Sequence, residues 1–229
     1  MGRRSVLAVG SHPDDCEFGC FGTLATRVTQ GDEVFILVLT RGERGGDASV
    51  RCQETEQAAA LIGAKLVEVA NFPDGSVEDN IDTVACIESW IQKTGATTVF
   101  SPSTKDRHQD HRNTAYAAIS AARYATEVYL YETPSTIQEF SPQIFVDIEP
   151  YLDLKKRALS AHLSQSKRSY FAESAIEGLS RYRAFQASGG RKAGAMEAFE
   201  VVRMIITGQT RQQGETILDR PSLLERVSR

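Results

Sequence analysis

The sequence predicts an α/β fold of Rossmann-like type, in which helices flank a mostly parallel β-sheet. Short apolar runs alternate with longer segments of helical period, and this alternation is typical of repeated βαβ units. The first apolar run leads straight into polar residues, as strands do at the ligand-binding edge of such a sheet. The length of 229 residues suits one domain, which we expect to span residues 1–207.

The expected strands are short segments rich in Val, Ile and other strand-forming residues. In chain order they are residues 5–10, 33–40, 65–70, 98–101, 127–131 and 144–148. Helices are expected at residues 53–62 and 81–91, which precede Gly63 and Gly95, and at residues 112–125 and 152–164. Each of these helices would connect or follow strands of the sheet.

Two segments near the C-terminus predict neither a strand nor a helix. Residues 178–194 are rich in glycine and arginine, and we interpret them as a mobile flap. Residues 208–229 are polar and charged, which fits a flexible arm and an oligomer contact equally well.

The composition excludes several classes of partner. The formal net charge of −4 is unfavourable for binding nucleic acid, because a phosphate backbone needs a clustered basic face. No apolar stretch is long enough to span a membrane, and the N-terminal apolar run is shorter than a signal-peptide core. We therefore expect a cytoplasmic protein. A homo-oligomer is also expected, since closed symmetric assemblies are usual among soluble enzymes.

The four cysteines are Cys16, Cys20, Cys52 and Cys86, and no two of them form a C-x-x-C pair. A chain of this length does not need disulfides, so we expect them to be reduced. Cys16 stands beside a candidate metal ligand and could itself be a soft ligand. A free cysteine is more often a small buried apolar residue, and we favour that interpretation.

The first candidate site is the sequence HPDD at residues 12–15, at the carboxyl end of the first expected strand. A histidine and an aspartate three residues apart can reach one metal ion from a tight turn, and Pro13 restricts that turn. Adjacent Asp14 and Asp15 point in different directions, so one can bind metal while the other accepts a proton from water. Alternatively, both acids only cap a helix that begins near Cys16.

The second candidate site is the sequence HQDH at residues 108–111, which ends a polar loop after the expected strand 98–101. His12, His108 and His111 are three of the four histidines in the chain. Their concentration at two strand ends indicates a shared metal site rather than a solvated polar loop.

Three nitrogen and oxygen ligands leave one position open for water, which is the arrangement of catalytic zinc. Such an ion polarises a carbonyl group and lowers the pKa of water. A His-Asp-His set also matches the facial triad of non-heme iron enzymes, so Fe²⁺ is an alternative to Zn²⁺. Iron oxygenases commonly use an all-β jelly roll, unlike this chain. A non-catalytic sugar- or nucleotide-binding module is disfavoured because no glycine-rich phosphate loop follows the first strand.

Both motifs and their surroundings resemble the LmbE-like or PIG-L family of zinc-dependent sugar de-N-acetylases. The leading motif continues as EFGCFGTLA at residues 17–25. Other similar segments are TRGE at 40–43, Arg51 with Glu54, FPDG at 72–75, and Lys155 with AHLSQ at 161–165, so the resemblance covers residues 5 to about 200. It implies an LmbE-like fold and removal of an acetyl group from an N-acetylated amino sugar or sugar conjugate.

The resemblance also implies a role for each motif residue. His12, Asp15 and His111 are expected to bind zinc, and Asp14 is expected to act as the general base. His108 is expected to stabilise the oxyanion or to protonate the leaving amine, with Asp110 orienting or tuning it. Amide hydrolysis needs such a donor because negative charge develops on the carbonyl oxygen.

Arg51 and Asp74 are expected to hold hydroxyl groups of a small-molecule N-acetyl sugar, as their placement in the family pattern implies. The alternative for Arg51 is an intrahelical pair with Glu54 on a wet face. His162 either lines the mouth of the site or has a structural role.

The chain departs from the family pattern at two places in the leading motif. Many members have a glutamate directly after the two aspartates, whereas this chain has Cys16 and then Glu17. The usual Gly-Gly is replaced by Phe21-Gly22, and a phenylalanine there leaves the size of the substrate open.

Overall fold

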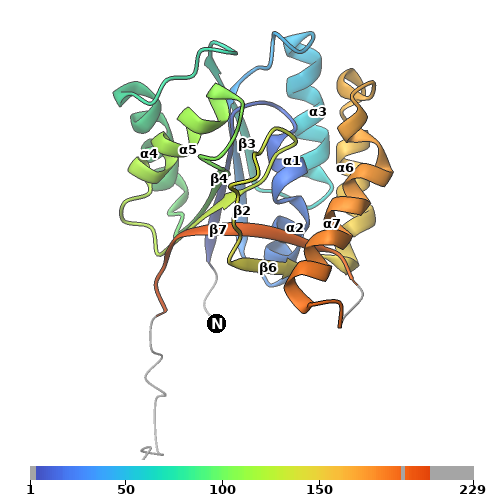
Figure 1. The fold of residues 1–229 in the computed structure, drawn as a ribbon. Coiled ribbons are helices and arrows are strands. Elements are labelled where there is room, and N and C mark those ends of the chain that lie inside the picture. The colour runs from blue at the N-terminus through green and yellow to red at the C-terminus, as the bar shows by residue number, and fades with distance from the viewer. Residues whose placement is uncertain (1–3, 192–193, 207–229) are drawn as a thin grey trace, which may run out of the picture.

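The computed structural model describes residues 4–191 and 194–206, and it confirms the expected α/β architecture (Figure 1). A seven-stranded sheet has the order β3-β2-β1-β4-β5-β7-β6. The parallel part consists of β1 (Ser5–Gly10), β2 (Glu33–Thr40), β3 (Leu66–Phe72), β4 (Thr98–Pro102) and β5 (Glu127–Tyr131). The last strand in the chain, β7 (Met196–Met204), runs antiparallel to both β5 and β6 (Ile144–Asp147).

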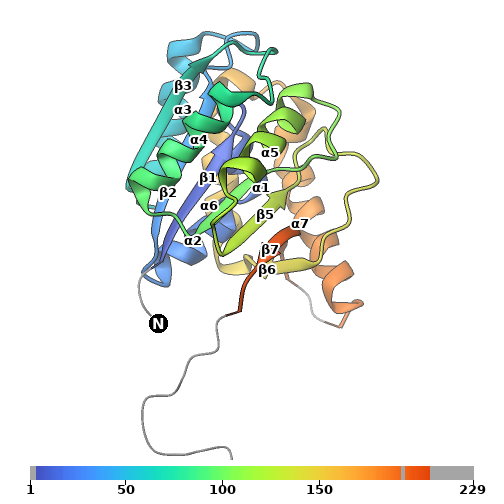
Figure 2. The same ribbon diagram turned by 90° about the vertical axis from the view of Figure 1, so that its left-hand side faces the viewer.

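Helices cover both faces of the sheet, which gives three layers (Figure 2). One face is covered by α4 (Ile81–Thr94) and α5 (Gln109–Ala121). The other face is covered by α1 (Asp15–Gly19), α2 (Phe21–Thr29), α3 (Ala48–Ala60) and α6 (Leu152–Ser160), with α7 (Glu173–Ser188) against β6 and β7. None of the helices in the described part of the chain is both long and apolar enough to cross a membrane.

Strand β1 lies at the centre of the core, and its side chains alternate between the two layers. Val6 and Ala8 pack with α1, α2, α3 and α6, whereas Leu7 and Val9 pack with α4 and α5. All four side chains are fully buried. A strand covered on both faces needs an uninterrupted apolar sequence, which is why this run predicts a parallel-sheet strand.

The strand order places two loops together at the edge of the sheet. The chain moves outward from β1 to β2 and β3, and α4 then returns it to β4 on the other side of β1. The connection after β1 therefore leads to one side of the sheet and the connection after β4 leads to the other side. Ligands bind in the crevice that opens between two such diverging connections. HPDD follows β1 and HQDH follows β4, so the topology brings both motifs to this crevice.

The prediction of a mobile flap at residues 178–194 is wrong for most of this segment, because residues 173–188 form helix α7. Ile176, Ser180 and Ala184 recur at helical spacing and are buried. Gly178 is a single glycine inside this helix, and such a residue weakens a helix without preventing it. Gly189 has a φ of 59° and ends the helix, so the glycine pair marks a C-terminal cap.

Strand β7 is absent from the expected set because two glutamates interrupt its apolar pattern. Glu197 and Glu200 are buried, and their carboxylates accept hydrogen bonds from Lys155 and Lys105, respectively. These partners come from elsewhere in the chain, so sequence periodicity alone does not reveal them. The polar arm expected at residues 208–229 lies outside the described residues.

Candidate functional site

A pocket of about 560 Å³ opens at the carboxyl ends of β1 and β4. Segments that are distant in sequence contribute to its wall. The lining residues are His12, Asp14, Asp15, Phe18, Arg44, Gly45, Arg51, Asp74, Gly75, Arg107, His108, Gln109, His111, Pro134, Ser135, Gln165, Arg168, Tyr170 and Phe171.

The turn after β1 fixes the two adjacent carboxylates in different directions. Asp15 is the first residue of α1, and its Oδ2 accepts the backbone N–H groups of Ser11 at 2.8 Å and His12 at 2.9 Å. Asp14 has a φ of 115°, the only positive φ of a non-glycine residue in the described part of the chain. Such a conformation costs about 1–3 kcal/mol and occurs where function requires it.

Three of the expected metal ligands converge on one point. Nδ1 of His12 lies 3.2 Å from Nε2 of His111 and 3.6 Å from Oδ2 of Asp15, and the same Nε2 lies 3.2 Å from Oδ1 of Asp15. A tetrahedral zinc ion with ligands at 2.0–2.1 Å separates neighbouring donor atoms by roughly 3.3–3.4 Å. The two nitrogens are spaced close to this value from each other and from an oxygen of Asp15, with His12 facing Oδ2 and His111 facing Oδ1, and all three side chains are buried.

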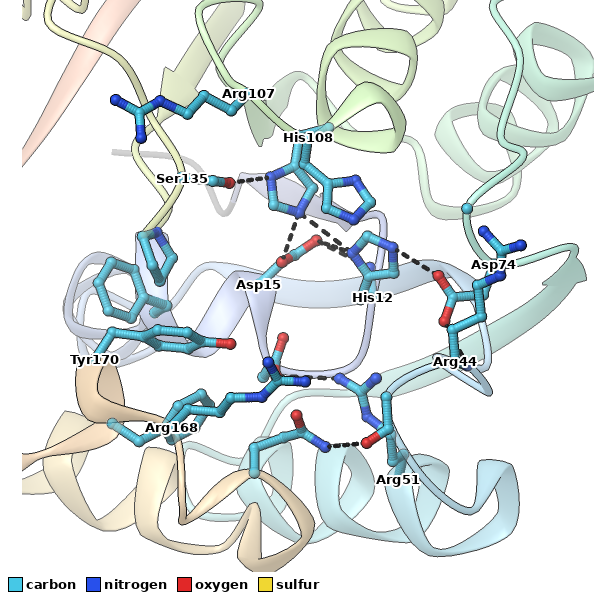
Figure 3. Close-up of a pocket in the computed structure, with 18 of the residues that line it drawn as sticks. His12, Asp15, Arg44, Arg51, Asp74, Arg107, His108, Ser135, Arg168 and Tyr170 are labelled. Atoms are coloured by element: carbon cyan, nitrogen blue, oxygen red, sulfur yellow. Dashed lines mark hydrogen bonds and ion pairs between the residues drawn. The ribbon is translucent and has the colours of Figure 1, made fainter.

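The other nitrogen of each histidine contacts carboxylates, which fixes the orientation of the ring. Nε2 of His12 lies 3.2 Å from Oδ1 of Asp74 (Figure 3). The same nitrogen lies 3.2 Å from Oδ2 of Asp110. Nδ1 of His111 lies 3.1 Å from Oδ2 of Asp106. These contacts leave Nδ1 of His12 and Nε2 of His111 directed toward Asp15.

The carboxylate of Asp110, which is expected to orient or tune His108, forms its hydrogen bonds with other groups. The carboxylate contacts His12 and accepts the backbone N–H groups of Gly75 at 2.7 Å and Val77 at 3.3 Å. Only the backbone N–H of Asp110 reaches His108, donating to Nδ1 at 3.2 Å. Because Asp110 follows the N-cap residue of α5, its side chain turns back toward the FPDG turn.

Two other groups of side chains could hold a cation in the described residues. His12, His108 and His111 form one, and His12, Asp74 and Asp110 form the other. The ring of His108 stacks on that of His111 with centroids 4.8 Å apart. The second group uses Nε2 of His12. The expected ligands His12, Asp15 and His111 instead use Nδ1 of His12, and their nitrogen and oxygen atoms are spaced as around a tetrahedral ion. Cys16 belongs to neither group and packs in the core, with Sγ 3.8 Å from the hydroxyl of Tyr131.

Arg51 contacts the strained turn rather than Glu54. Its Nη2 donates to the carbonyl of Pro13 at 2.7 Å and to Oδ2 of Asp14 at 3.1 Å, and its Nη1 donates to the carbonyl of Gly42 at 2.8 Å. Glu54 accepts the backbone N–H and the hydroxyl of Ser164. The intrahelical pair considered for Arg51 is therefore not formed, and its buried guanidinium supports Asp14.

Asp74 lines the pocket, but both its carboxylate oxygens already have partners. Oδ1 contacts His12, and Oδ2 accepts the backbone N–H of Arg44 at 2.8 Å. These hydrogen bonds outweigh the effect of burial and lower the pKa of Asp74 to about 2, so the group is ionised at neutral pH.

Burial and charge separate the two adjacent aspartates. Burial raises the pKa of Asp14 to about 6, with Arg51 opposing the rise. Burial also tends to raise the pKa of Asp15. The neighbouring His111 and His12 outweigh this effect and hold the pKa of Asp15 well below its usual value. Asp14 is thus the carboxylate whose proton affinity suits acid–base work near neutral pH.

The pKa values of His111 and His108 are shifted in opposite directions. Burial disfavours the charged form of His111, but Asp15 and Asp106 outweigh it and raise the pKa to about 9. Burial lowers the pKa of His108, and the nearby His111 and His12 add to the effect. A neutral His108 that accepts at Nδ1 carries its proton on Nε2 and can donate from there.

His162 does not belong to the residues that line the pocket. Its side chain is fully buried, and Nε2 lies 3.4 Å from Oε1 of Glu17. Sequence reasoning missed other residues that the structure places at the site: Asp106, Arg44, Arg168 and Tyr170. Of these, only Asp106 lies in the polar loop that ends with HQDH, and neither spacing nor composition distinguishes it there.

Residues 7–122 match the PIG-L family, GlcNAc-PI de-N-acetylase. The chain is 33% identical over 170 residues to the uncharacterized deacetylase YaiS of Escherichia coli (strain K12), covering 71% of this chain and 92% of the relative. It is 28% identical over 187 residues to the diacetylchitobiose deacetylase of Thermococcus kodakarensis, covering 71% and 70%. The crystal structure of the conserved protein TT1542 from Thermus thermophilus superposes with a TM-score of 0.77 at 26% identity, covering 91% of this chain and 99% of that one.

These relatives confirm the expected class of enzyme, an amide hydrolase of the deacetylase type. The matched region contains both histidine motifs and the strands that carry them. The chain therefore belongs to the PIG-L family of deacetylases.

Proposed function

We propose that this protein is a zinc-dependent hydrolase that removes the acetyl group from an N-acetylated amino sugar or sugar conjugate. The observation that carries the proposal is the convergence of His12, Asp15 and His111 beside the partly buried carboxyl group of Asp14. Deacetylase relatives, one of which is a diacetylchitobiose deacetylase, support the choice of substrate class.

A divalent cation held by these three side chains would lower the pKa of water and polarise the amide carbonyl. Their nitrogen and oxygen donors suit zinc, and three protein ligands leave room for water or substrate. The same donors accept iron, so the metal content of the purified protein is the direct measurement of its identity.

Asp14 is the residue placed to move the proton. As water attacks the carbonyl carbon, the Asp14 carboxylate accepts its proton, and Arg51 keeps that carboxylate oriented at 3.1 Å. The C–N bond then breaks, and the proton passes to the amine nitrogen. The products are acetate and the free amino sugar.

His108 is the residue placed to stabilise charge on the carbonyl oxygen. Its Nδ1 accepts the backbone N–H of Asp110, so its Nε2–H can donate toward the oxygen that becomes negative. Removal of one such donor typically costs about 100- to 1000-fold in turnover.

Asp74 and Asp110 act on the metal centre through His12. Because both carboxylates contact Nε2 of His12, they hold its Nδ1 toward Asp15 and His111. We propose this positioning role for both residues. Asp74 also lines the pocket and can accept a sugar hydroxyl, as the resemblance to the family implies.

The test measures acetate release from N-acetylglucosamine and N,N'-diacetylchitobiose by the zinc-loaded enzyme, together with zinc content by mass spectrometry. The variant Asp14→Asn is expected to retain zinc and to lose about 100- to 10,000-fold in kcat, because it removes the proton acceptor. Asparagine tolerates the positive φ of this position better than alanine does, so the fold is preserved.

The proposal fails if no acetate is released by the wild-type enzyme, or if Asp14→Asn retains normal turnover. The cytoplasmic location and the homo-oligomeric state expected from the sequence stay predictions, and light scattering measures the second.

A further inference from the structure

The carboxylate of Asp106, which contacts Nδ1 of His111, is held in place by a loop that follows β5. Its Oδ1 accepts the hydroxyl of Ser135 at 2.6 Å, and its Oδ2 accepts the hydroxyl of Thr133. The oxygens of Thr133 and Ser135 also lie 3.2 and 3.3 Å from Nδ1 of His111, and Figure 3 shows Ser135 directed toward the histidine rings. The surroundings of this imidazole nitrogen therefore depend on where the loop lies.

Backbone hydrogen bonds hold this loop against the segment that contains Asp106. Residues 105–107 and 135–137 form two such bonds, at 3.0 and 3.1 Å, around an isolated antiparallel bridge between Asp106 and Thr136. A pair of segments this short is at best marginally stable by itself. Contacts beyond the bridge are therefore needed to fix both segments in one position.

An ion pair between Glu132 and Arg183 connects the start of this loop to helix α7. Glu132 directly precedes Thr133, and its carboxylate accepts hydrogen bonds from Nε of Arg183 at 2.8 Å and from Nη2 at 2.5 Å. Each side chain is only 11% exposed. The remaining nitrogen, Nη1, donates to Oε1 of Gln186 at 2.7 Å. A carboxylate bound by two nitrogens of one guanidinium is fixed in direction as well as in distance, so the pair limits where the loop can begin.

A neighbouring arginine on the same helix forms an ordinary surface pair and provides a comparison. Arg181 pairs with Glu149 and Glu177, and its side chain is 41% exposed. Arg183 instead binds the residue adjacent to Thr133, although it is not among the residues that line the pocket. The two arginines thus share a helix and a chemistry but differ in their connection to the site.

We propose that Arg183 is a positioning residue for the metal ligand His111. Its pair with Glu132 fixes the loop at 133–136, and this loop holds Asp106 against the imidazole. The inference rests on the proposed function, in which His111 binds the metal. A carboxylate behind a metal-binding histidine orients the ring and makes it more basic, which strengthens metal binding. Loss of the ion pair should therefore weaken zinc binding from a position outside the pocket.

The first measurement is the zinc affinity, determined by competition with a fluorescent chelator. Arg183→Gln removes both hydrogen bonds to Glu132 and should raise the zinc Kd about 10-fold, because the support behind His111 becomes loose. The matched control is Arg181→Gln, which removes the same charge from the exposed pair on the same helix and should keep the Kd of the wild-type protein. An unchanged Kd in Arg183→Gln would overturn the proposal.

A double-mutant cycle separates positioning from a general loss of stability. Asp106→Asn has already lost the carboxylate behind His111, so adding Arg183→Gln should change the zinc Kd by less than about twofold in this background. A loss of the same size with and without the Asp106 carboxylate would mean that Arg183 does not act through it, and the proposal would be wrong.

Circular dichroism verifies that each variant is folded. Should Arg183→Gln fail to fold, the double variant Glu132→Gln/Arg183→Gln replaces it in both measurements, because it leaves no buried charge without a partner. The expected results are the same, since this variant also lacks the ion pair.

A measurement on the metal-free protein separates failure of this inference from failure of the proposed function. The Nδ1–H of His111 that faces Asp106 at 3.1 Å should give a low-field proton resonance in NMR spectra, assigned by its loss in His111→Ala. We expect it to persist in Arg181→Gln and to disappear through exchange with water in Arg183→Gln. Its absence from the wild-type protein, or its persistence in Arg183→Gln, would overturn the positioning role. If the wild-type protein releases no acetate from any N-acetyl sugar, the proposed function has failed, and this resonance still decides the role of Arg183.

Discussion

Asp14 shows how one residue combines backbone strain with an ion pair to a buried arginine. Its left-handed backbone conformation turns the carboxyl group toward Arg51, while the next residue, Asp15, turns toward the histidines. The sequence predicts that the two carboxylates diverge because adjacent side chains in a tight turn cannot point the same way. The identity of the partner, Arg51 from α3, depends on how that helix packs.

Asp106 is the residue whose contribution to the metal centre the sequence did not reveal. Its carboxylate contacts Nδ1 of His111 and accepts hydrogen bonds from Thr133 and Ser135. Replacement by asparagine should weaken zinc binding about 10- to 100-fold, because His111 loses the acceptor that orients its ring and raises its basicity. Competition with a fluorescent zinc chelator measures the change.

The control for Asp106→Asn is Asp153→Asn, which removes a carboxylate at an exposed ion pair on α6. Its zinc affinity should equal that of the wild-type enzyme. If Asp106→Asn also binds zinc normally, the contact with His111 has no role in holding the metal.

At the scale of elements, a substitution in α7 tests whether residues 173–188 form a helix rather than a flap. Gly178 lies inside α7, is exposed, and would meet no atom within 4 Å if it carried a Cβ. Gly178→Ala should stabilise the protein by up to about 1 kcal/mol, because alanine loses less backbone entropy in a helix. The melting temperature should rise by about 2–4 °C.

The contrasting variant is Gly189→Ala at the end of the same helix. Its φ of 59° disfavours a side chain, so this substitution should destabilise the protein. If Gly178→Ala left the melting temperature unchanged or lowered it, residues 173–188 would not behave as a stable helix in solution.

Strand β7 and helix α2 are joined by one buried carboxylate. Glu197 accepts the backbone N–H groups of Gly22 at 2.9 Å and Thr23 at 2.7 Å, and Nζ of Lys155 lies 2.7 Å from it. Glu197→Ala should lower the free energy of unfolding by about 3–5 kcal/mol, since it leaves a buried ammonium group without its partner. Urea denaturation followed by circular dichroism measures this change.

An exposed ion pair provides the comparison for Glu197. Glu149 pairs with Arg181 at the surface, with side chains 48% and 41% exposed. Glu149→Ala should cost less than about 1 kcal/mol. A similar small loss in Glu197→Ala would mean that β7 and α6 do not depend on the buried pair.

At the scale of the whole molecule, the metal centre connects two parts of the chain that are far apart in sequence. His12 follows β1, and His111 lies on α5 after β4. Because a metal that binds only the native state stabilises it, zinc at about 100 times its Kd should raise the free energy of unfolding by about 2.7 kcal/mol. A thermal shift with added zinc, reversed by a chelator, measures the effect.

The shift should disappear in His111→Ala and persist in Asp14→Asn, which keeps all three donors. A zinc-dependent shift of wild-type size in His111→Ala would show that another group of side chains holds the metal.

The sequence predicts the parallel core well because its determinants are local. The bounds of β1, β2 and β5 are the same in prediction and structure. The predicted starts of the helices are less accurate than those of the strands. Helix α3 begins at Ala48 and α5 at Gln109, several residues before the expected starts at 53 and 112. Asp47 caps the first and His108 the second, and polar residues outside the apolar pattern thus extend both helices.

The sequence by itself determined the class of fold, the two histidine motifs and their position at strand ends, since apolar periodicity and residue order carry that information. Only the tertiary structure decided which groups surround them: Asp106 behind His111, Asp110 behind His12, and Arg51 beside Asp14. His12 and Asp110 are 98 positions apart, and even Asp106, five positions before His111, reaches it only through the fold of the loop between them. The geometry of these contacts is set by strand order and helix packing, which neither spacing nor composition encodes locally.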